Sequence, residues 1–265
     1  LWASMNVYPE QKHSEIAACE PYFIGSHSGA SGAWVSGPED LDTPYKWGYA
    51  NMTTVEGLFA IGDASGASSH KFSSGSHTEG RIAGKAAVKY IVDKGGEPNV
   101  DMGKVEELKT KILKPLDLVE QHQDELTDVE VNTNYIMPRQ FLHRLQKLMD
   151  EYAGGVSSAF KTSKALLERG LELMEYLQED SDKQGARNLH ELMRAWENYQ
   201  RMWIAESHLR TMLFREETRW PGYYFRSDTP KMDEENWHCF ANCKFDPASG
   251  EWEMMKRDVW NMPGV

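Results

Sequence analysis

The sequence predicts an α/β segment followed by a helical domain with an irregular tail. Three observations lead to this fold class. Residues 20–80 are rich in Gly, Ser, Ala and His, whereas residues 101–220 are rich in Glu, Lys, Leu, Met and Arg. A short apolar run at 58–61 is typical of a strand, and the apolar patterns after it have helical spacing. The sequence DKGGEP at 93–98 is a strong turn signal and separates the two parts.

In the first part, the run LFAI at 58–61 is flanked by Gly57 and Gly62. It predicts a buried parallel strand, although periodicity alone leaves a turn of helix open. A helix is predicted over 78–93, which ends at a pair of glycines. Its predicted apolar face consists of Ile82, Ala83, Ala86, Ala87, Tyr90 and Ile91.

In the second part, apolar residues recur at three- and four-residue spacing. They predict four helices, over 105–125, 138–152, 158–180 and 186–215. Three or four such helices can pack as a bundle. In the tail, NCKFDPASGEW at 242–252 predicts a β-hairpin whose turn spans 246–250.

Charge and composition exclude several classes of protein. The 265 residues carry 29 Lys and Arg against 41 Asp and Glu, which gives a net charge of −12. This acidity argues against a nucleic-acid-binding protein, which needs a basic face. No apolar run reaches the roughly 18 residues of a membrane span, so we expect no membrane insertion. The three cysteines lack the spacing of a secreted disulfide framework, which favours the cytoplasm.

The strongest local candidate for a binding site is the pair Gly62 and Asp63, at the end of the predicted strand. Glycine lets a ligand approach the backbone, and a carboxylate can accept a hydrogen bond from a ribityl or ribose hydroxyl. The same residues also suit a strand that ends in an Asp-initiated turn without any ligand. Residue types alone leave both interpretations open.

The second candidate is SSHKFSSGSH at 68–77, before the predicted helix. Small residues at a helix entry expose backbone N–H groups, and the helix dipole favours an anion or an electron-rich flavin edge there. Lys71, His70, His77 and Arg81 add positive charge. The alternative is an ordinary serine-capped helix.

The third candidate is the loop PYFIGSHSGASG at 21–32, which places His27 among glycines and serines. A substrate can approach such an imidazole closely, although a structural loop histidine is the alternative. The spacing of His27, His70 and His77 fits no zinc signature, so no metal site is predicted. We expect Glu216 and Glu217 to be solvated or ion-paired rather than an acid–base couple.

Along the chain, the histidine loop comes first, the predicted strand that ends in Gly62 and Asp63 comes second, and the helix entry at 68–77 comes third. The helix entry continues into GRIAG at 80–84. This order resembles the carboxyl-terminal part of the FAD-binding domain in the succinate dehydrogenase and fumarate reductase flavoprotein superfamily. REETR at 215–219 and DEENW at 233–237 resemble that superfamily's E-[ST]-R and D-x-x-N-W signatures. The dicarboxylate enzymes carry H-x-x-M-G-G and H-G-A-N-R at the two loops, which this sequence lacks. The sequence instead resembles the alpha subunits of dissimilatory adenylylsulfate reductases, in the combination of GSHSGASGAW, GDASGASSHKFSSGSHTEGRIAGKAA and FREETRWPGYYFR.

The resemblance implies three regions and a set of site residues. Residues 1–22 would end a capping domain, 23–100 would be the carboxyl-terminal part of a Rossmann-like FAD-binding domain, and 101–265 would form the helical domain. His27 would be the catalytic residue, beside the sulfonate or the leaving phosphate of the substrate. The FAD, held non-covalently, would contact Gly62, Asp63, Lys71, Phe72, Ser73 and Ser74.

The resemblance also implies a reaction and a partner. The full enzyme would interconvert adenylyl sulfate with AMP and sulfite, and an iron–sulfur beta subunit would deliver the electrons. The superfamily's G-x-G-x-x-G loop for the FAD pyrophosphate is missing from the sequence, so we expect a part of a longer subunit that binds no FAD in isolation. Two alternatives remain. One is another FAD-dependent enzyme of the superfamily, acting on a dicarboxylate or an amino acid, and the other is a non-enzymatic helical interaction module.

Overall fold

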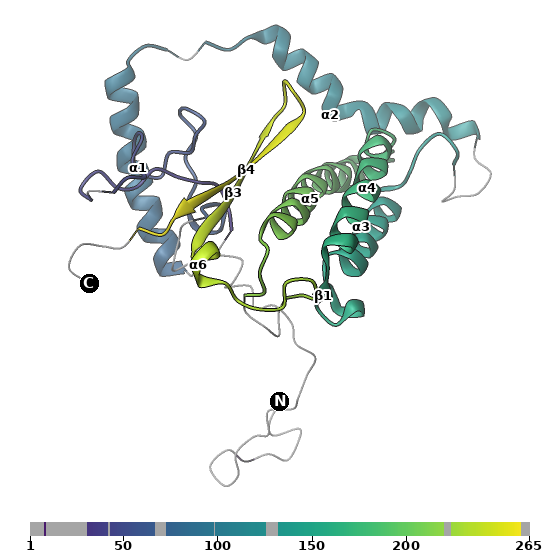
Figure 1. Cartoon of the computed structure of the whole chain (residues 1–265). Coiled ribbons are helices and arrows are strands. Elements are labelled where there is room, and N and C mark those ends of the chain that lie inside the picture. Colours follow the sequence, from purple (N-terminus) through teal and green to yellow (C-terminus); the bar gives the residue numbers. More distant parts are fainter. Residues whose placement is uncertain are drawn as a thin grey trace.

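A computed structural model shows a mostly helical chain with a small amount of sheet (Figure 1). The structure describes Tyr8 and residues 31–41, 43–66, 73–97, 99–125, 132–219 and 224–260. Helical content with some sheet agrees with the coarser part of the predicted fold class. No helix within these ranges combines the length and the apolar content that crossing a bilayer requires.

The core of the molecule lies among three packed helices, α3 (Pro138–Tyr152), α4 (Lys164–Ser181) and α5 (Leu189–Phe214). Their apolar residues recur every three or four positions, so each helix turns one apolar stripe inward. The side chains at the centre of this core are fully or almost fully buried: Phe141, Leu145, Leu167, Met174, Met202 and Leu209. The predicted bundle is therefore present, built from three of the four predicted helices.

Helix ends follow local capping chemistry. α3 begins at Pro138, where a missing N–H costs nothing, and the Gln140 side chain accepts a hydrogen bond from the Met137 amide. The helix predicted over 158–180 begins later, at Lys164, because the Ser163 side chain caps the helix by accepting from the Leu166 amide. The residues before it form a single 3₁₀ turn, Val156–Ser158, and the short strand β1 (Lys161–Thr162).

The helices α1 (Ser73–Lys94) and α2 (Met102–His122) lie outside this core. α1 begins five residues before the predicted start. Its buried residues are Ala83 and Ala86, whereas Ile82 and Ile91 of the predicted face are exposed. α2 begins three residues before the helix predicted over 105–125, and the last three predicted residues form a 3₁₀ turn. It joins α5 through a hydrogen bond of 2.9 Å from the Trp196 indole to the Ile112 carbonyl.

The predicted buried parallel strand at 58–61 is wrong for the described residues. Phe59 forms an isolated antiparallel bridge with Met52, and Leu58 and Ile61 are 54% and 39% exposed. A parallel strand is buried only when strands and helices cover it on both faces. Within the described residues, Phe59 pairs with the short segment around Met52 alone. The apolar run at 58–61 is therefore irregular and forms no strand.

The tail contains the predicted hairpin, formed by β3 (Cys239–Asp246) and β4 (Glu251–Asp258) in antiparallel register. The Asp246 carboxylate accepts from the Ala248 amide at 2.9 Å, which stabilises the turn that follows β3. A second small sheet pairs β1 in parallel with β2 (Phe225–Arg226), and the short helix α6 (Glu234–Trp237) precedes the hairpin.

The hairpin connects the two predicted parts of the chain. At its turn end, Phe245 lies 4.7 Å from Trp203 of α5, measured between ring centroids. At its other end, the Tyr45 hydroxyl donates to the Asp258 carbonyl at 2.6 Å, and Phe240 packs edge-on against Trp34. Figure 1 shows β3 and β4 running between the α1 region and α5.

Candidate functional site

The predicted pair Gly62 and Asp63 lies in the 3₁₀ turn Gly62–Ala64, packed against the first turns of α1. Gly62 has a φ of +55°, and a Cβ at this position would lie 2.9 Å from the Ser76 hydroxyl oxygen. The Gly62 amide donates to the Glu79 carboxylate at 2.6 Å. Both the backbone conformation and the close approach of the helix require glycine here.

Asp63 follows Gly62 with its side chain on the surface. Its carboxylate belongs to the same turn that the helix holds in place. An exposed carboxylate in a fixed turn is suited to accept hydrogen bonds from a polyol chain laid across it. A turn is present at Gly62–Ala64, but the strand that was expected before it is not. The turn leaves both interpretations of the residue types open.

The segment that follows the predicted histidine loop is bonded to this turn. The Ala33 amide donates to the Ala64 carbonyl at 2.8 Å, and the Gly66 amide donates to the Ala33 carbonyl at 2.9 Å. The backbones touch so closely that a Cβ on Gly32 would lie 2.7 Å from the Gly66 nitrogen. Gly32 and Ala33 therefore lie directly beside the turn that contains Gly62 and Asp63.

The start of α1 provides the second component of the site. Ser73 and Ser74 are exposed in its first turn, which contains no acidic residue. The partial positive charge of a helix amino terminus is therefore not offset by a carboxylate in that turn. Arg81, two turns further along, is exposed as well. The turn that contains Gly62 and Asp63 packs on α1, the helix that begins with Ser73 and Ser74.

The remaining predicted site residues, His27, Lys71 and Phe72, lie outside the described residues, as do His70 and Cys19. His77 is described and is exposed on α1. Within the described ranges, no group of three or more His, Cys, Asp and Glu side chains is arranged to hold a metal ion.

A buried ion network lies in the tail, where the sequence suggested only solvated or paired charges. Glu217 is fully buried and accepts from Arg215 at 2.5 Å and from Arg219 at 2.6 Å. The Asp233 amide adds a third donor at 2.9 Å. Burial would raise the pKa of Glu217, but the hydrogen bonds from Arg219, Asp233 and Arg215 lower it below its ordinary value.

The network joins three segments of the tail. Arg215 also donates to the carbonyls of Trp237 and Cys239, at 3.0 and 2.7 Å. It therefore fixes the end of α5 to α6 and to the start of β3. The two tail signatures therefore form one connected structural unit. Two glutamates between two arginines in REETR were a sequence signal for ion pairs, but they did not show which glutamate is buried.

The comparisons with known proteins agree with this arrangement. Residues 142–263 match the family model described as the carboxyl-terminal domain of the fumarate reductase flavoprotein. The adenylylsulfate reductase alpha subunit of Megalodesulfovibrio gigas is 47% identical over 99% of this chain. The chain is similar to adenylylsulfate reductase alpha subunits along nearly its whole length. This confirms the resemblance inferred from the sequence motifs.

Solved structures support the same relationship. The adenylylsulfate reductase of Archaeoglobus fulgidus aligns with a TM-score of 0.89 and 51% identity, over 98% of this chain and 41% of that one. An adenosine-5-phosphosulfate reductase in complex with sulfite, described as a covalent adduct, aligns over the same shares with a TM-score of 0.88 and 51% identity. The quinol fumarate reductase of E. coli shares the fold, with a TM-score of 0.59 at 18% identity over 80% of this chain and 36% of that one.

This chain spans about two fifths of the length of these reductases, 40% of the curated relative and 41% of the solved structures. The Gly62 turn and the start of α1 lie before the segment matched by the family model, whereas the buried tail network lies within it.

Proposed function

We propose that this chain is part of the flavin-containing catalytic subunit of an adenylylsulfate reductase, which interconverts adenylyl sulfate with AMP and sulfite. The observation that carries the proposal is the 47% identity to such an alpha subunit over 99% of this chain. The local geometry supports it, because a glycine turn, an exposed aspartate and a helix start free of acidic residues adjoin one another.

The residues at the turn fit a flavin. The Gly62 turn is pressed onto α1 with no side chain of its own above the backbone, and Asp63 presents a carboxylate beside it. A ribityl chain needs an acceptor for its hydroxyls, and the exposed Asp63 carboxylate supplies one. Gly62 itself is buried, and it lets the start of α1 pack directly on this turn. We assign the cofactor as FAD, bound non-covalently, which would supply the two-electron redox chemistry when bound.

In this proposal each residue has a separate role. Asp63 accepts a hydrogen bond from the ribityl chain, and Gly62 lets the start of α1 approach this turn closely. Ser73 and Ser74, with Lys71 and Phe72 before them, line the flavin edge at the positive end of α1. His27 donates a hydrogen bond to the sulfonate or to the leaving phosphate, and so stabilises negative charge there.

The proposed domain division follows from these roles. Residues 1–22 would end a capping domain, 23–100 would complete a Rossmann-like FAD-binding domain, and 101–265 would form the helical domain. The rest of the FAD-binding domain would come from the part of the subunit outside this sequence. An iron–sulfur beta subunit in the cytoplasm would exchange electrons with the flavin.

The test uses the full-length subunit with its flavin. Asp63→Ala removes one charge-assisted hydrogen bond, worth about 1.5–3 kcal/mol, so the flavin dissociation constant should rise by about tenfold or more. Asp40→Ala is the matched control, because Asp40 is also exposed in a turn but lies outside the site. An unchanged dissociation constant in the Asp63 variant would contradict the assignment.

A second readout tests the chemistry rather than the binding. Sulfite added to the flavin-loaded, full-length protein should change the visible flavin spectrum, since sulfite is the proposed substrate of the reverse reaction. A flavin spectrum that is insensitive to sulfite would favour another member of the superfamily. A full-length protein that purifies without flavin would favour the non-enzymatic alternative.

A further inference from the structure

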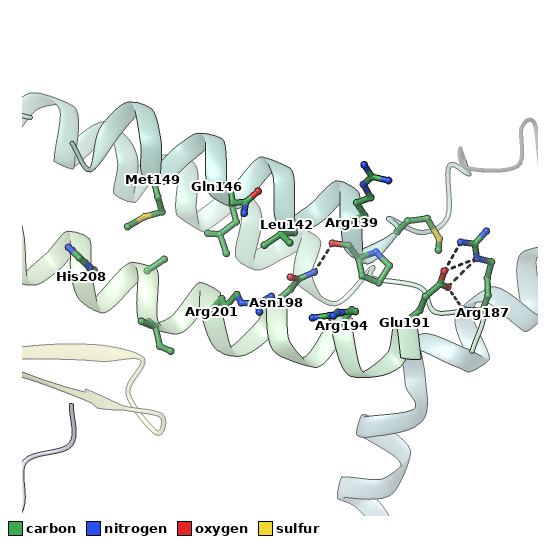
Figure 2. A pocket seen from close by; sticks show the side chains of 15 residues that line it. Arg139, Leu142, Gln146, Met149, Arg187, Glu191, Arg194, Asn198, Arg201 and His208 are labelled. Atoms are coloured by element: carbon green, nitrogen blue, oxygen red, sulfur yellow. Dashed lines mark hydrogen bonds and ion pairs between the residues drawn. The ribbon is translucent and has the colours of Figure 1, made fainter. Parts of the chain in front are cut away.

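A groove of about 760 Å³ lies between α3 and α5, on the helical part of the chain. Figure 2 shows its lining residues, which come from both helices and from the connection that precedes α5. At one end, Asn198 of α5 donates to the Pro138 carbonyl at the start of α3, at 2.7 Å. The groove is separate from the Gly62 turn, and neither the sequence motifs nor the proposed function assigns it a role.

The floor of the groove is apolar and follows the helix axes. Leu142 and Met149 contribute from α3, and Ile204 and Ala205 contribute from α5. The residues that line it on each helix are three or four positions apart, so each helix presents one continuous stripe. Ile204 is 66% exposed, which leaves a branched apolar side chain in water in the absence of a partner.

The rim of the groove is positively charged in a chain whose net charge is −12. Arg187, Arg194 and Arg201 follow one another at seven-residue intervals, and Arg139 belongs to the lining on the α3 side. The Arg187 guanidinium is paired with the Glu191 carboxylate at 2.5 Å. Arg194 and Arg201 share a single carboxylate, that of Glu197, at 2.7 and 3.2 Å. The two positive charges of Arg194 and Arg201 therefore exceed the single negative charge of Glu197.

We propose that this groove binds an acidic amphipathic helix of a partner polypeptide. Two parallel stripes with an apolar floor accept a third helix, whose apolar residues at three- and four-residue spacing would pack on Leu142, Met149 and Ile204. Carboxylates seven residues apart on that helix would face Arg194 and Arg201, because seven residues span about 10.5 Å along a helix. The proposal does not depend on the proposed reductase activity.

Charge decides between the possible occupants. A second copy of this chain docked symmetrically would bring arginines against arginines, which opposes association. A nucleic acid would match the charge of the rim but not the apolar floor. An acidic helix satisfies both, since its carboxylates meet the rim and its apolar stripe covers Ile204.

The test is photo-crosslinking in the full-length protein, expressed in the cells that contain its partners. A benzophenone amino acid at position 204 should cross-link to one segment of another polypeptide, identified by mass spectrometry. That segment should be rich in Asp and Glu and should carry apolar residues at three- and four-residue spacing. The same probe at position 176, exposed on α4 and outside the groove, should not capture it.

Charge reversal tests the role of the rim. Arg194→Glu together with Arg201→Glu should lower the cross-link yield by about tenfold. Arg169→Glu is the matched control, because Arg169 forms an equivalent exposed pair with Glu172, three residues ahead on α4. Higher salt should also lower the yield in the unsubstituted protein, which keeps the test valid if the double variant folds poorly.

Several outcomes would overturn the proposal. They are a cross-link from position 204 to another part of the same subunit or to a second copy, a partner segment without acidic residues, and no cross-link at all. A yield that neither charge reversal nor salt changes would overturn it as well.

Discussion

Glu217→Gln would remove the negative charge at the centre of the tail network while keeping the shape of the side chain. In the native protein, the fully buried carboxylate accepts hydrogen bonds from Arg215, Arg219 and the Asp233 amide. The two arginine side chains are only 20% and 26% exposed. The amide group of glutamine would leave Arg215 without its counter-charge and Arg219 with the half-exposed Glu234 alone, at 2.8 Å. One of its own donors would also face the two guanidinium groups.

The expected loss in the free energy of unfolding follows from the burial of this network. Breaking a buried ion pair by removing one partner costs about 3–5 kcal/mol, because the remaining charge is left unpaired. With a urea m-value of about 3 kcal/mol/M, the unfolding midpoint should fall by about 1–1.7 M. Glu216→Gln is the control, because the adjacent Glu216 is exposed and its loss should change stability by less than about 0.5 kcal/mol.

The assay is urea unfolding of the full-length subunit, with amide hydrogen exchange of the peptides that cover 212–240. Exchange should accelerate in these peptides of the Glu217 variant and remain unchanged elsewhere. Equal midpoints for the Glu217 and Glu216 variants would refute the reasoning.

The pKa of Glu217 predicts a pH dependence with a definite sign. Its folded-state pKa is lowered from 4.5, so the unfolded state binds more protons as the pH falls past that value. The stability from this group is fully present above about pH 4.5 and is lost as the pH falls through the lower folded pKa. Glu217→Gln should flatten this part of the stability curve.

Three further predictions concern single substitutions, two of them argued from the structure and one from the proposed function. Gly62→Ala should destabilise the turn by about 1–3 kcal/mol, because the alanine Cβ would lie 2.9 Å from the Ser76 hydroxyl oxygen. The melting temperature and the flavin content of the variant measure this destabilisation. Leu209→Ala should lower the free energy of unfolding by about 2–5 kcal/mol, since Leu209 is fully buried; a cost below 1 kcal/mol would contradict the packing. His27→Ala should retain flavin but lose about 10²–10³ in rate, whereas His77→Ala should lose less; full activity in the His27 variant would contradict its role.

The helices could be predicted from the sequence because their apolar spacing is a local property. The helix predicted at 138–152 coincides with α3, and Pro138 marks its first residue. The prediction of a buried parallel strand at 58–61 was wrong. Burial of a parallel strand depends on neighbouring segments, which the apolar run at 58–61 does not itself specify. The same reason left Ile91 of α1 exposed where the sequence predicted a buried face.

The candidate site could be predicted only in part. Gly62 was identifiable because a glycine at the end of an apolar run suggests a special backbone conformation, and its φ of +55° agrees. The distinction between Glu216 and Glu217 could not be made, because adjacent glutamates look alike until a fold buries one of them. The groove was not predicted either, although Arg187, Arg194 and Arg201 at seven-residue spacing were a visible signal.

Turnover by the full-length subunit with its electron-transfer partner tests the central claim most directly. The rate of acceptor reduction would be measured with AMP and sulfite together, with each alone, and with succinate. Reduction that requires both AMP and sulfite and does not occur with succinate is the expected result. Reduction with succinate, or no dependence on sulfite, would contradict the proposed reaction.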